Sequence, residues 1–386
     1  MRGMCALTDG PVGANIQLQD ASFPLPRKPS GCRGVRVRVL PIQPLDTRKQ
    51  QILKAVVNDY VDTAEPVGSH MLAGRYAFGV RSATIRNEMA ELAELGYLHQ
   101  PHTSAGRIPS DLGYRFYVDK LMDMAVVSVD EASRAKRVLS SRRAEIELLL
   151  EHTCRILADL ARYTSLATRP KVRDAVIRHV SVANVARGKV LAVVVLDNGR
   201  IIHELVESGK TGSAVDPIRA TNFLTRELGG RTASSLSERA MGPAPSDPRE
   251  MADLLDRVLE FIKVEAEAED EADIHLEGAS YIMRQPEFKS PERLEAVLSL
   301  LDERSALYRL FGSIMSPEVT VIIGSESPLG AMSDCSFVGA KYRIGGRVAG
   351  TIGVMGPTRM NYRRAVGAVE FMVRNLEALL SELSVA

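Results

Sequence analysis

The chain is 386 residues long, which is too long for one small unit and indicates two or three domains. Its 45% hydrophobic and 25% charged residues are typical of a soluble globular protein. The formal net charge of +1 excludes a general basic field as the source of nucleic-acid binding, so any such affinity has to come from a local patch.

The first 45 residues mix Gly, Pro and Arg with little periodicity, which predicts a disordered N-terminal extension over residues 1–45. One alternative is a basic arm that contacts DNA phosphates through Arg27, Lys28, Arg33, Arg36 and Arg38. An extension translated from an early start codon is another.

A tight arrangement of three helices is predicted next. Apolar residues recur at helical spacing over residues 47–61, with Asp46 or Thr47 as the N-cap. Pro66 begins a second, short helix, and a Phe-Gly turn leads to Ser82, a good N-cap for the third. Two helices joined by a tight turn, with a supporting helix, are typical of a helix-turn-helix.

The third helix separates buried from exposed positions near its start. Ile85, Met89 and Leu92 recur at i, i+4 and i+7, which places them on one buried stripe. Five residues with DNA-contacting chemistry fall outside that stripe, namely Arg81, Ser82, Thr84, Arg86 and Asn87. Arg can pair with guanine edges or phosphates, and Asn can pair with adenine. These five are our candidate DNA-binding residues in the helix.

A β-hairpin is predicted after the third helix. Short extended arms at Tyr97–Gln100 and Arg107–Pro109 flank a polar tip over residues 101–106, as in a wing. Four residues here suit phosphate oxygens, namely His102, Thr103, Ser104 and Arg107. A metal site at His99 and His102 is the less favoured interpretation, because they belong to no metal-binding signature.

The distribution of charge supports this interpretation more than its amount does. Residues 47–120 hold nine Lys plus Arg against eight Asp plus Glu, a net of only +1. Between Glu65 and Glu88, however, the charged residues are all arginines. A three-helix unit that binds protein instead of DNA is the structural alternative.

The remaining two thirds are predicted to form α+β structure. A long helix is expected from Asp130 to about Tyr163, either as a core helix or as a subunit contact. Strands are expected at 178–185, 189–196, 201–206, 319–324, 337–344 and 348–354, with helices at 217–228, 248–267 and 362–383. We expect the strands to form one antiparallel sheet, interrupted by an insertion at about 210–300. The acidic run 265–273 is interpreted as a solvated helix end or loop.

No catalytic or metal-binding pattern emerges from the sequence. The seven histidines are dispersed, and the cysteines at 5, 32, 154 and 335 lack the spacing of a zinc site or disulfide framework. Two Gly-containing segments, 324–327 and 345–347, are interpreted as turns rather than phosphate cradles. No run reaches the length of a transmembrane helix. We therefore expect a cytoplasmic non-enzyme without cofactor, metal or membrane contact.

Two stretches resemble a known family. They are Ile52–Gly96, especially the runs 65–69 and 81–89, and the run Thr103–Val118. Both are similar to the heat-inducible transcription repressors, HrcA. The similarity extends from about Arg48 to the C-terminus, whereas the first 45 residues are unusual for the family, as is Leu112 in place of a charged residue.

The resemblance implies an α+β multidomain fold. It would comprise a winged helix-turn-helix at 46–125, a GAF-like domain at 126–209 and 301–386, and an inserted α+β dimerisation domain at 210–300. It implies a dimeric repressor of chaperone operons that binds an inverted-repeat operator in double-stranded DNA. A GroEL-type chaperonin would keep the repressor active, and heat would inactivate it. A repressor controlled by a metabolite in the GAF-like domain and a protein-binding scaffold are the alternatives.

Overall fold

The computed structural model describes most of the chain after the N-terminal segment, over residues 44–102, 105–124, 127–140, 146–186, 188–207, 216–236, 249–267, 274–314, 316 and 318–385. The predicted extension therefore lies almost entirely outside the described residues, as does much of the acidic run 265–273. None of the described helices combines the length and the apolar character needed to cross a bilayer.

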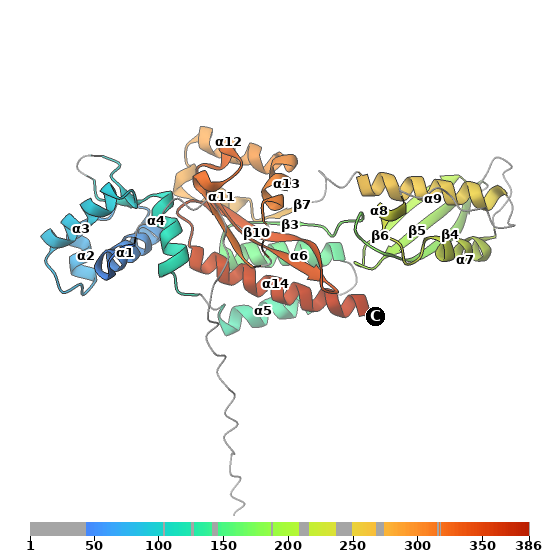
Figure 1. The fold of residues 1–386 in the computed structure, drawn as a ribbon, viewed down its shortest axis with the longest axis horizontal. Coiled ribbons are helices and arrows are strands. Elements are labelled where there is room, and N and C mark those ends of the chain that lie inside the picture. The colour runs from blue at the N-terminus through green and yellow to red at the C-terminus, as the bar shows by residue number, and fades with distance from the viewer. Residues whose placement is uncertain are drawn as a thin grey trace, which may run out of the picture. The chain divides into compact units, whose positions relative to one another are not determined.

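The first described unit, residues 44–121, contains four α-helices, a π-helical turn and a small hairpin (Figure 1). We call it the N-terminal unit. Its elements are α1 (Thr47–Thr63), α2 (Ser69–Arg75), α3 (Ser82–Glu94), β1 (Leu98–His99), β2 (Ile108–Pro109), α4 (Asp111–Phe116) and the π-helical turn η1 (Tyr117–Leu121). Of the two predicted N-caps of α1, Asp46 and Thr47, the structure has Asp46, because its carboxylate accepts the Lys49 N–H at 2.8 Å.

Two predicted helix starts in this unit are wrong. The second helix begins at Ser69, not at Pro66, because Val67 uses its N–H and C=O to pair with Arg107 as a β-bridge. The third helix has Arg81 at its N-cap position, and Ser82 is its first helical residue. The expected hairpin is confirmed, with His99 opposite Ile108.

A five-stranded antiparallel sheet forms the centre of the second part, in the order β7-β3-β10-β9-β8. The strands are β3 (Thr164–Thr168), β7 (Ile274–Glu277), β8 (Thr320–Ile323), β9 (Cys335–Ile344) and β10 (Arg347–Pro357). The β9–β10 turn holds Gly345 and Gly346 at φ values of +56° and +82°, which L side chains rarely adopt. The interpretation of these glycines as a turn is thus confirmed.

Helices cover both faces of this sheet (Figure 1). One face packs on α6 (Ile146–Ala161) and α14 (Tyr362–Val385). The other packs on α11 (Ser280–Met283), the 3-10 turn η2 (Pro286–Phe288), α12 (Pro291–Asp302) and α13 (Arg304–Gly312). Short 3-10 turns η3 (Gly324–Glu326) and η4 (Gly330–Met332) connect β8 to β9. We call this assembly the sheet unit.

The expected long helix at 130–163 is wrong as a single element. It is replaced by α5 (Val129–Ser140) and α6, two separate helices in contact with each other. Arg364 of α14 lies 3.7 Å from Glu131 of α5, so both helices adjoin α14.

The expectation of one sheet is also wrong. Strands β4 (Ile177–Ala186), β5 (Lys189–Leu196) and β6 (Ile201–Glu207) match the predicted ranges but form their own three-stranded sheet. That sheet shares a separate apolar core with α7 (Pro217–Leu228), α8 (Ala233–Leu236) and α9 (Arg249–Glu267). The sequence could not show this, because alternating Val and Ile residues fit either sheet equally well. We call residues 172–267 the three-stranded unit.

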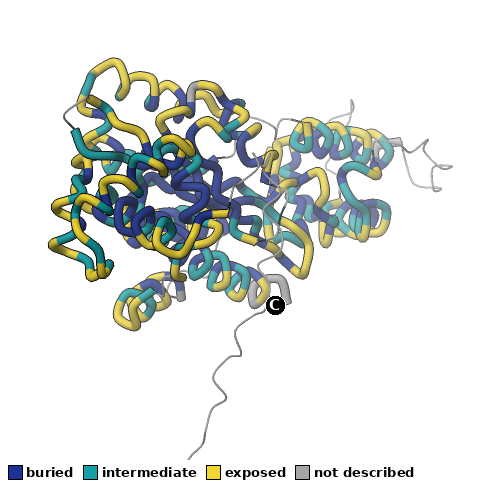
Figure 2. The backbone as a smooth tube through the Cα atoms, turned by 60° about the vertical axis from the view of Figure 1, so that its left-hand side comes forward, coloured by how far each residue is buried: buried dark blue, intermediate teal, exposed yellow. Residues whose placement is uncertain are grey.

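The apolar residues of the N-terminal unit continue without a break into the layer between the five-stranded sheet and α14. Figure 2 shows buried segments in dark blue on the inner sides of the elements and exposed segments in yellow on the outer turns. This shared core places the N-terminal unit directly on the sheet unit.

Candidate nucleic-acid interface

The amino-terminal ends of α2 and α3 lie side by side. The hydroxyl oxygens of Ser69 and Ser82, each the first residue of its helix, are 3.3 Å apart. Aligned peptide dipoles make each helix start partly positive, and the first N–H groups of a helix lack partners within it. Two such ends at one place favour an anion such as phosphate.

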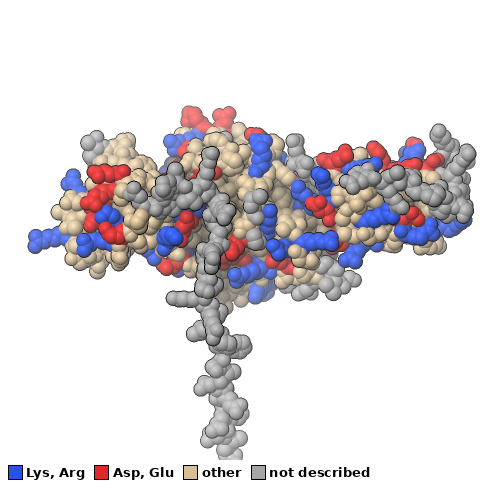
Figure 3. Space-filling model, viewed as in Figure 1, with Lys and Arg blue, Asp and Glu red and all other residues tan. Residues whose placement is uncertain are grey.

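The predicted helix residues differ in exposure. Arg81, Arg86 and Asn87 are exposed, whereas Ser82 and Thr84 are half-buried. Neither arginine forms an ion pair with any residue that the structure describes. Figure 3 shows Lys and Arg side chains projecting where α2 and α3 lie. Arg81 and Arg86 therefore place positive charge on the exposed surface at the start of α3.

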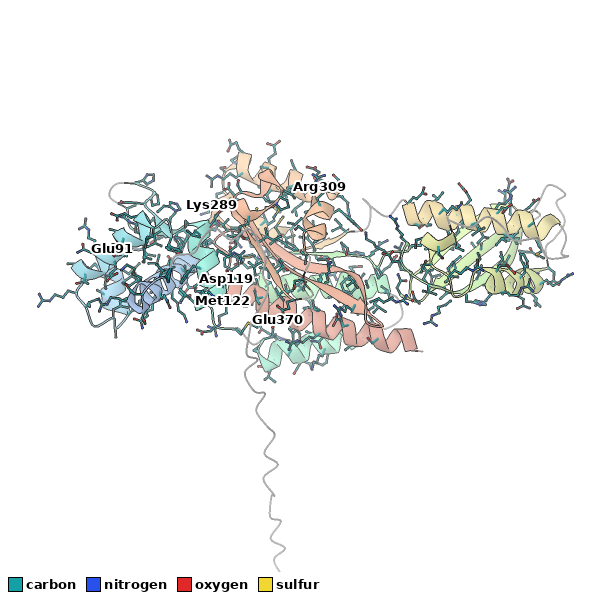
Figure 4. The ribbon with its side chains drawn as sticks, viewed as in Figure 1. Glu91, Asp119, Met122, Lys289, Arg309 and Glu370 are labelled. Carbon is teal, nitrogen blue, oxygen red and sulfur yellow. The ribbon has the colours of Figure 1, made fainter. Side chains whose placement is uncertain are left out.

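Two of the three acidic residues of α3, Glu88 and Glu91, pair with α1. Lys49 Nζ lies 2.8 Å from Glu88 and 2.9 Å from Glu91, whose place on α3 is labelled in Figure 4. Arg48 lies 3.7 Å from Glu88. The hydrogen bond to Glu88, with those to Glu91 and Asp46, raises the pKa of Lys49 above its ordinary value. Lys49 is therefore charged throughout the physiological pH range and neutralises Glu88 and Glu91, whereas Glu94 is exposed at the end of α3.

The angle between α1 and α2 is fixed by a buried carboxylate. Asp59 is 1% exposed, and its Oδ1 accepts hydrogen bonds from Arg75 at 2.9 Å and from the Tyr76 hydroxyl at 2.8 Å. Burial, followed by the bond to Asp59, raises the pKa of Tyr76 to about 12. The phenol thus remains protonated and keeps donating to Asp59. Arg75 therefore acts in packing the helices and is not available to a ligand in the way that Arg86 is.

The hairpin residues are only partly placed. His102 is exposed at the tip, where its carbonyl accepts the Ala105 N–H at 2.8 Å, while Thr103 and Ser104 lie outside the described residues. Arg107 lies at the base of the hairpin and is half-buried. Its backbone exchanges hydrogen bonds of 2.8 and 2.9 Å with Val67, which ties the hairpin to the start of α2.

The tie between hairpin and α2 depends on a glycine. A Cβ on Gly106 would lie 2.3 Å from the carbonyl oxygen of Val67, so any side chain here would force the two segments apart. The hairpin, α2 and α3 are consequently held as one surface.

Sequence reasoning missed a group of polar contacts, some buried and some exposed, between the N-terminal unit and the sheet unit. Arg115 of α4 is 8% exposed and binds Glu326 of η3. Ser325, which precedes Glu326 in the chain, donates hydrogen bonds from its backbone N–H and its hydroxyl to Asp111. One signal was present in the sequence, since Arg115 interrupts the run Tyr114–Tyr117 of residues that are otherwise aromatic and buried. The partner turn at 324–327 could not be inferred.

The chain is similar to known proteins over most of its length. The family model described as "HrcA protein C terminal domain" matches residues 147–366. The heat-inducible transcription repressor HrcA of Desulforamulus reducens is 38% identical over 340 residues, covering 88% of this chain and 98% of that protein. The protein of the same name from Acetivibrio thermocellus is 36% identical over 348 residues, covering 88% and 97% respectively.

The fold is similar to that of a solved structure. It is described as the crystal structure of a hypothetical protein at 2.2 Å resolution, and it superposes with a TM-score of 0.56 at 22% sequence identity, covering 88% of this chain and 98% of that chain.

Proposed function

Since this chain belongs to the HrcA family of heat-inducible transcription repressors, which regulate transcription negatively, we propose that it represses chaperone operons by binding an inverted-repeat operator as a homodimer. The exposed Arg81 and Arg86, at the start of α3 and without an ion pair to any described residue, carry this proposal. They put positive charge and guanidinium donors on a helix narrow enough to enter a major groove.

We assign the N-terminal unit as a winged helix-turn-helix, in which α3 reads bases and the β1–β2 hairpin is the wing. Asn87 and Arg86 suit base edges, and the paired helix starts at Ser69 and Ser82 suit a backbone phosphate. The wing residues His102, Thr103, Ser104 and Arg107 are proposed phosphate contacts. For Arg107, the support is a buried Nε without a hydrogen-bond partner among the described residues.

The sheet unit is proposed to be GAF-like, with the three-stranded unit as its inserted dimerisation domain. The separate apolar core of β4–β6 with α7–α9 favours an insertion at about 172–267, in place of the expected 210–300. The two sides of the insertion, β3 and β7, are neighbours in the five-stranded sheet, so a chain leaving one returns to the other.

The outer face of the three-stranded sheet supports a subunit contact. Its inner face is covered by helices, yet Ile201 and Leu205 of β6 are 61% and 47% exposed on the other face. They lie opposite Val195 and Leu191 of β5, which are only partly buried. An apolar sheet face of this kind is suited to pack against its own copy about a two-fold axis.

Dimerisation matters for recognition because one helix contacts only about half a helical turn of DNA. A two-fold dimer reads both halves of an inverted repeat and adds their binding free energies. We further propose that heat lowers the population of the DNA-binding fold and that a GroEL-type chaperonin restores it. General support is the small free energy that separates folded from unfolded proteins.

Gel-shift titration tests this function. The purified protein is titrated with an inverted-repeat operator and with scrambled DNA of equal length, before and after a heat pulse and with or without chaperonin. We expect specific retardation that falls after the pulse and recovers with chaperonin. Equal affinity for both DNAs would contradict sequence-specific repression, and absence of retardation at low salt would favour a protein-binding scaffold.

A cavity supports a second function, control by a small metabolite. It has a volume of about 320 Å³ beside the β9–β10 hairpin, and its lining includes Tyr308, Phe311 and Lys341. Aromatic walls with a few charged groups are common in small-molecule sites. A thermal-shift screen of carboxylate and nucleotide metabolites would reveal this function, because a ligand that binds the folded state raises its Tm.

A further inference from the structure

A two-pronged ion pair links the N-terminal unit to the sheet unit. Arg115 Nε donates to Glu326 Oε1 at 2.7 Å, Nη2 donates to the other carboxylate oxygen, and Nη2 also binds the Val321 carbonyl at 2.6 Å. The same guanidinium lies 3.2 Å from Asp119, a residue of η1 that is labelled in Figure 4. A planar guanidinium group that is hydrogen-bonded along two of its edges is fixed in orientation as well as in position.

The receiving side of this contact is itself rigid. Glu326 Oε2 accepts the Ile323 N–H at 2.9 Å, which holds the side chain against the turn η3 at the end of β8. On the same turn, Ser325 N and Oγ donate to Asp111 Oδ2 at 3.0 and 2.7 Å. A Cβ on Gly324 would lie 2.6 Å from that carboxylate oxygen, so the turn and α4 are in close contact.

A second anchor lies at the end of α1. Arg359, between β10 and α14, donates to the carbonyl oxygen of Val61 and to Glu287, with Nε 2.5 Å from Glu287 Oε1. The bond to Val61 crosses to a different helix of the N-terminal unit from the one that carries Arg115. Two anchors on two helices, with an apolar core between them, oppose both translation and rotation.

We infer that Asp111, Arg115 and their partners Ser325 and Glu326 are positioning residues for operator recognition, which lock the reading helix at a fixed distance and angle to the body of the dimer. This inference rests on the proposed function. These contacts determine which spacing between operator half-sites a dimer accepts. Two α3 helices that are held rigidly in a dimer fit half-sites at one separation and one rotation about the DNA axis. A loosely tethered unit would accept many spacings, at lower affinity for each.

The test variant is the double substitution Ser325→Ala/Glu326→Gln. Both changes lie in the sheet unit, so α1–α4 and the hairpin keep their own sequence. Glu326→Gln retains the shape of the side chain while removing its charge. The matched control is Arg155→Ala, which removes exposed pairs of α6 with Glu151 at 2.8 Å and with Glu277 of β7 at 3.4 Å, both outside the N-terminal unit.

Operators with the inverted repeat at its best spacing, and with two base pairs added, are compared by titration. Two extra base pairs rotate one half-site by about 70° relative to the other. The wild-type protein and Arg155→Ala should bind the altered operator at least about tenfold more weakly than the best one. We expect the double variant to reduce this ratio by at least about threefold. An unchanged ratio would overturn the inference.

A DNA-free measurement separates this inference from the proposed function. Spin labels at Glu94→Cys, in α3, and at Lys289→Cys, in the sheet unit, are placed in a chain carrying Cys5→Ser and Cys32→Ser. Electron-spin distance measurements should give a narrow distribution, which the double variant broadens. A broad distribution before substitution, or a narrow one after it, would overturn the lock whatever the outcome of DNA binding. Loss of specific DNA binding with a narrow distribution would contradict the proposed function alone.

Discussion

Lys49 of α1 lies between two carboxylates of α3, with its Nζ 2.8 Å from Glu88 and 2.9 Å from Glu91. This contact explains how a segment with nearly balanced charge can present a basic face. Glu88 and Glu91 are paired with α1, while Arg81 and Arg86 remain exposed.

Replacing Lys49 by Met tests the role of its ion pairs with Glu88 and Glu91. The Glu88 side chain, only 13% exposed, would lose its main partner. We expect a loss of about 0.5 to 1 kcal/mol in the free energy of unfolding, together with weaker DNA binding at low salt. Urea titration and gel shift measure the two effects. Lys54→Met removes a more exposed pair with Asp123 and serves as the control. Equal effects of both substitutions would contradict a special role for Lys49.

Arg86→Ala should weaken operator binding by about 1 to 3 kcal/mol and relax the preference at one position of each half-site. The side chain is exposed on α3, so the fold should be unaffected. Titration against operators with single base changes measures both quantities. Arg309→Ala, on α13 of the sheet unit, is the matched exposed control and should bind as the wild type does (Figure 4). Retention of full base preference by Arg86→Ala would rule out base reading at this position.

Gly106→Ala should separate the hairpin from α2. The added Cβ would meet the Val67 carbonyl at 2.3 Å, and such overpacking costs about 1 to 3 kcal/mol. We expect a lower Tm and reduced affinity for DNA of any sequence. Gly74→Ala has no atom within 4 Å of the new Cβ and lies within α2, so it should stabilise the helix slightly. A Tm for Gly106→Ala at or above that of the wild type would refute the close contact.

Ile201→Asp should weaken the dimer. A charge placed in the proposed contact face would be desolvated on association, and the dissociation constant should rise at least about tenfold. Sedimentation equilibrium measures this change. Ile218→Asp, 73% exposed on α7, is the matched control outside the sheet face and should leave the dimer intact. Indistinguishable association of the two variants would move the subunit contact elsewhere.

The reactivity of the buried thiols at a chosen pH tests whether the core around them is closed to solvent. Burial raises the pKa of both Cys154 and Cys335 to about 12, from an ordinary value of 9.0. Because the folded state favours the protonated thiol, their contribution to stability is complete below about pH 9 and is lost as the pH rises toward 12. In a Cys5→Ser/Cys32→Ser chain, we expect no reaction with a thiol reagent at pH 8 until urea unfolds the protein. Fast labelling of the folded chain would show that these sites are open.

Individual helices, caps and strands could be predicted from the sequence, whereas the contacts between elements could not. The cap at Asp46, the hairpin at residues 98–109 and strand β5 follow from nearby residues, and the structure confirms them. The helix predicted to begin at Pro66 includes Val67, but the backbone hydrogen bonds of Val67 go to Arg107, forty residues later. The division of the strands between two sheets likewise depends on which cores they enter, a property of the folded chain that alternating Val and Ile residues do not record.

The candidate site follows the same division. The exposure of Arg81, Arg86 and Asn87 could be predicted from helical periodicity alone. Neutralisation of Glu88 by Lys49 and burial of Arg115 could not, because both depend on contacts between separate elements.

The partners Arg115 and Glu326 are separated by 211 residues of chain. During synthesis, the whole DNA-binding segment therefore emerges from the ribosome long before the turn η3, with which it forms this contact, is made. The N-terminal segment can begin to fold during synthesis, since domains generally fold as they emerge. The docking contact waits for the last fifth of the chain. A product that terminates before Glu326 would contain the DNA-binding segment without the turn that binds Arg115. Only a chain that extends past this turn can form the contact between the two units.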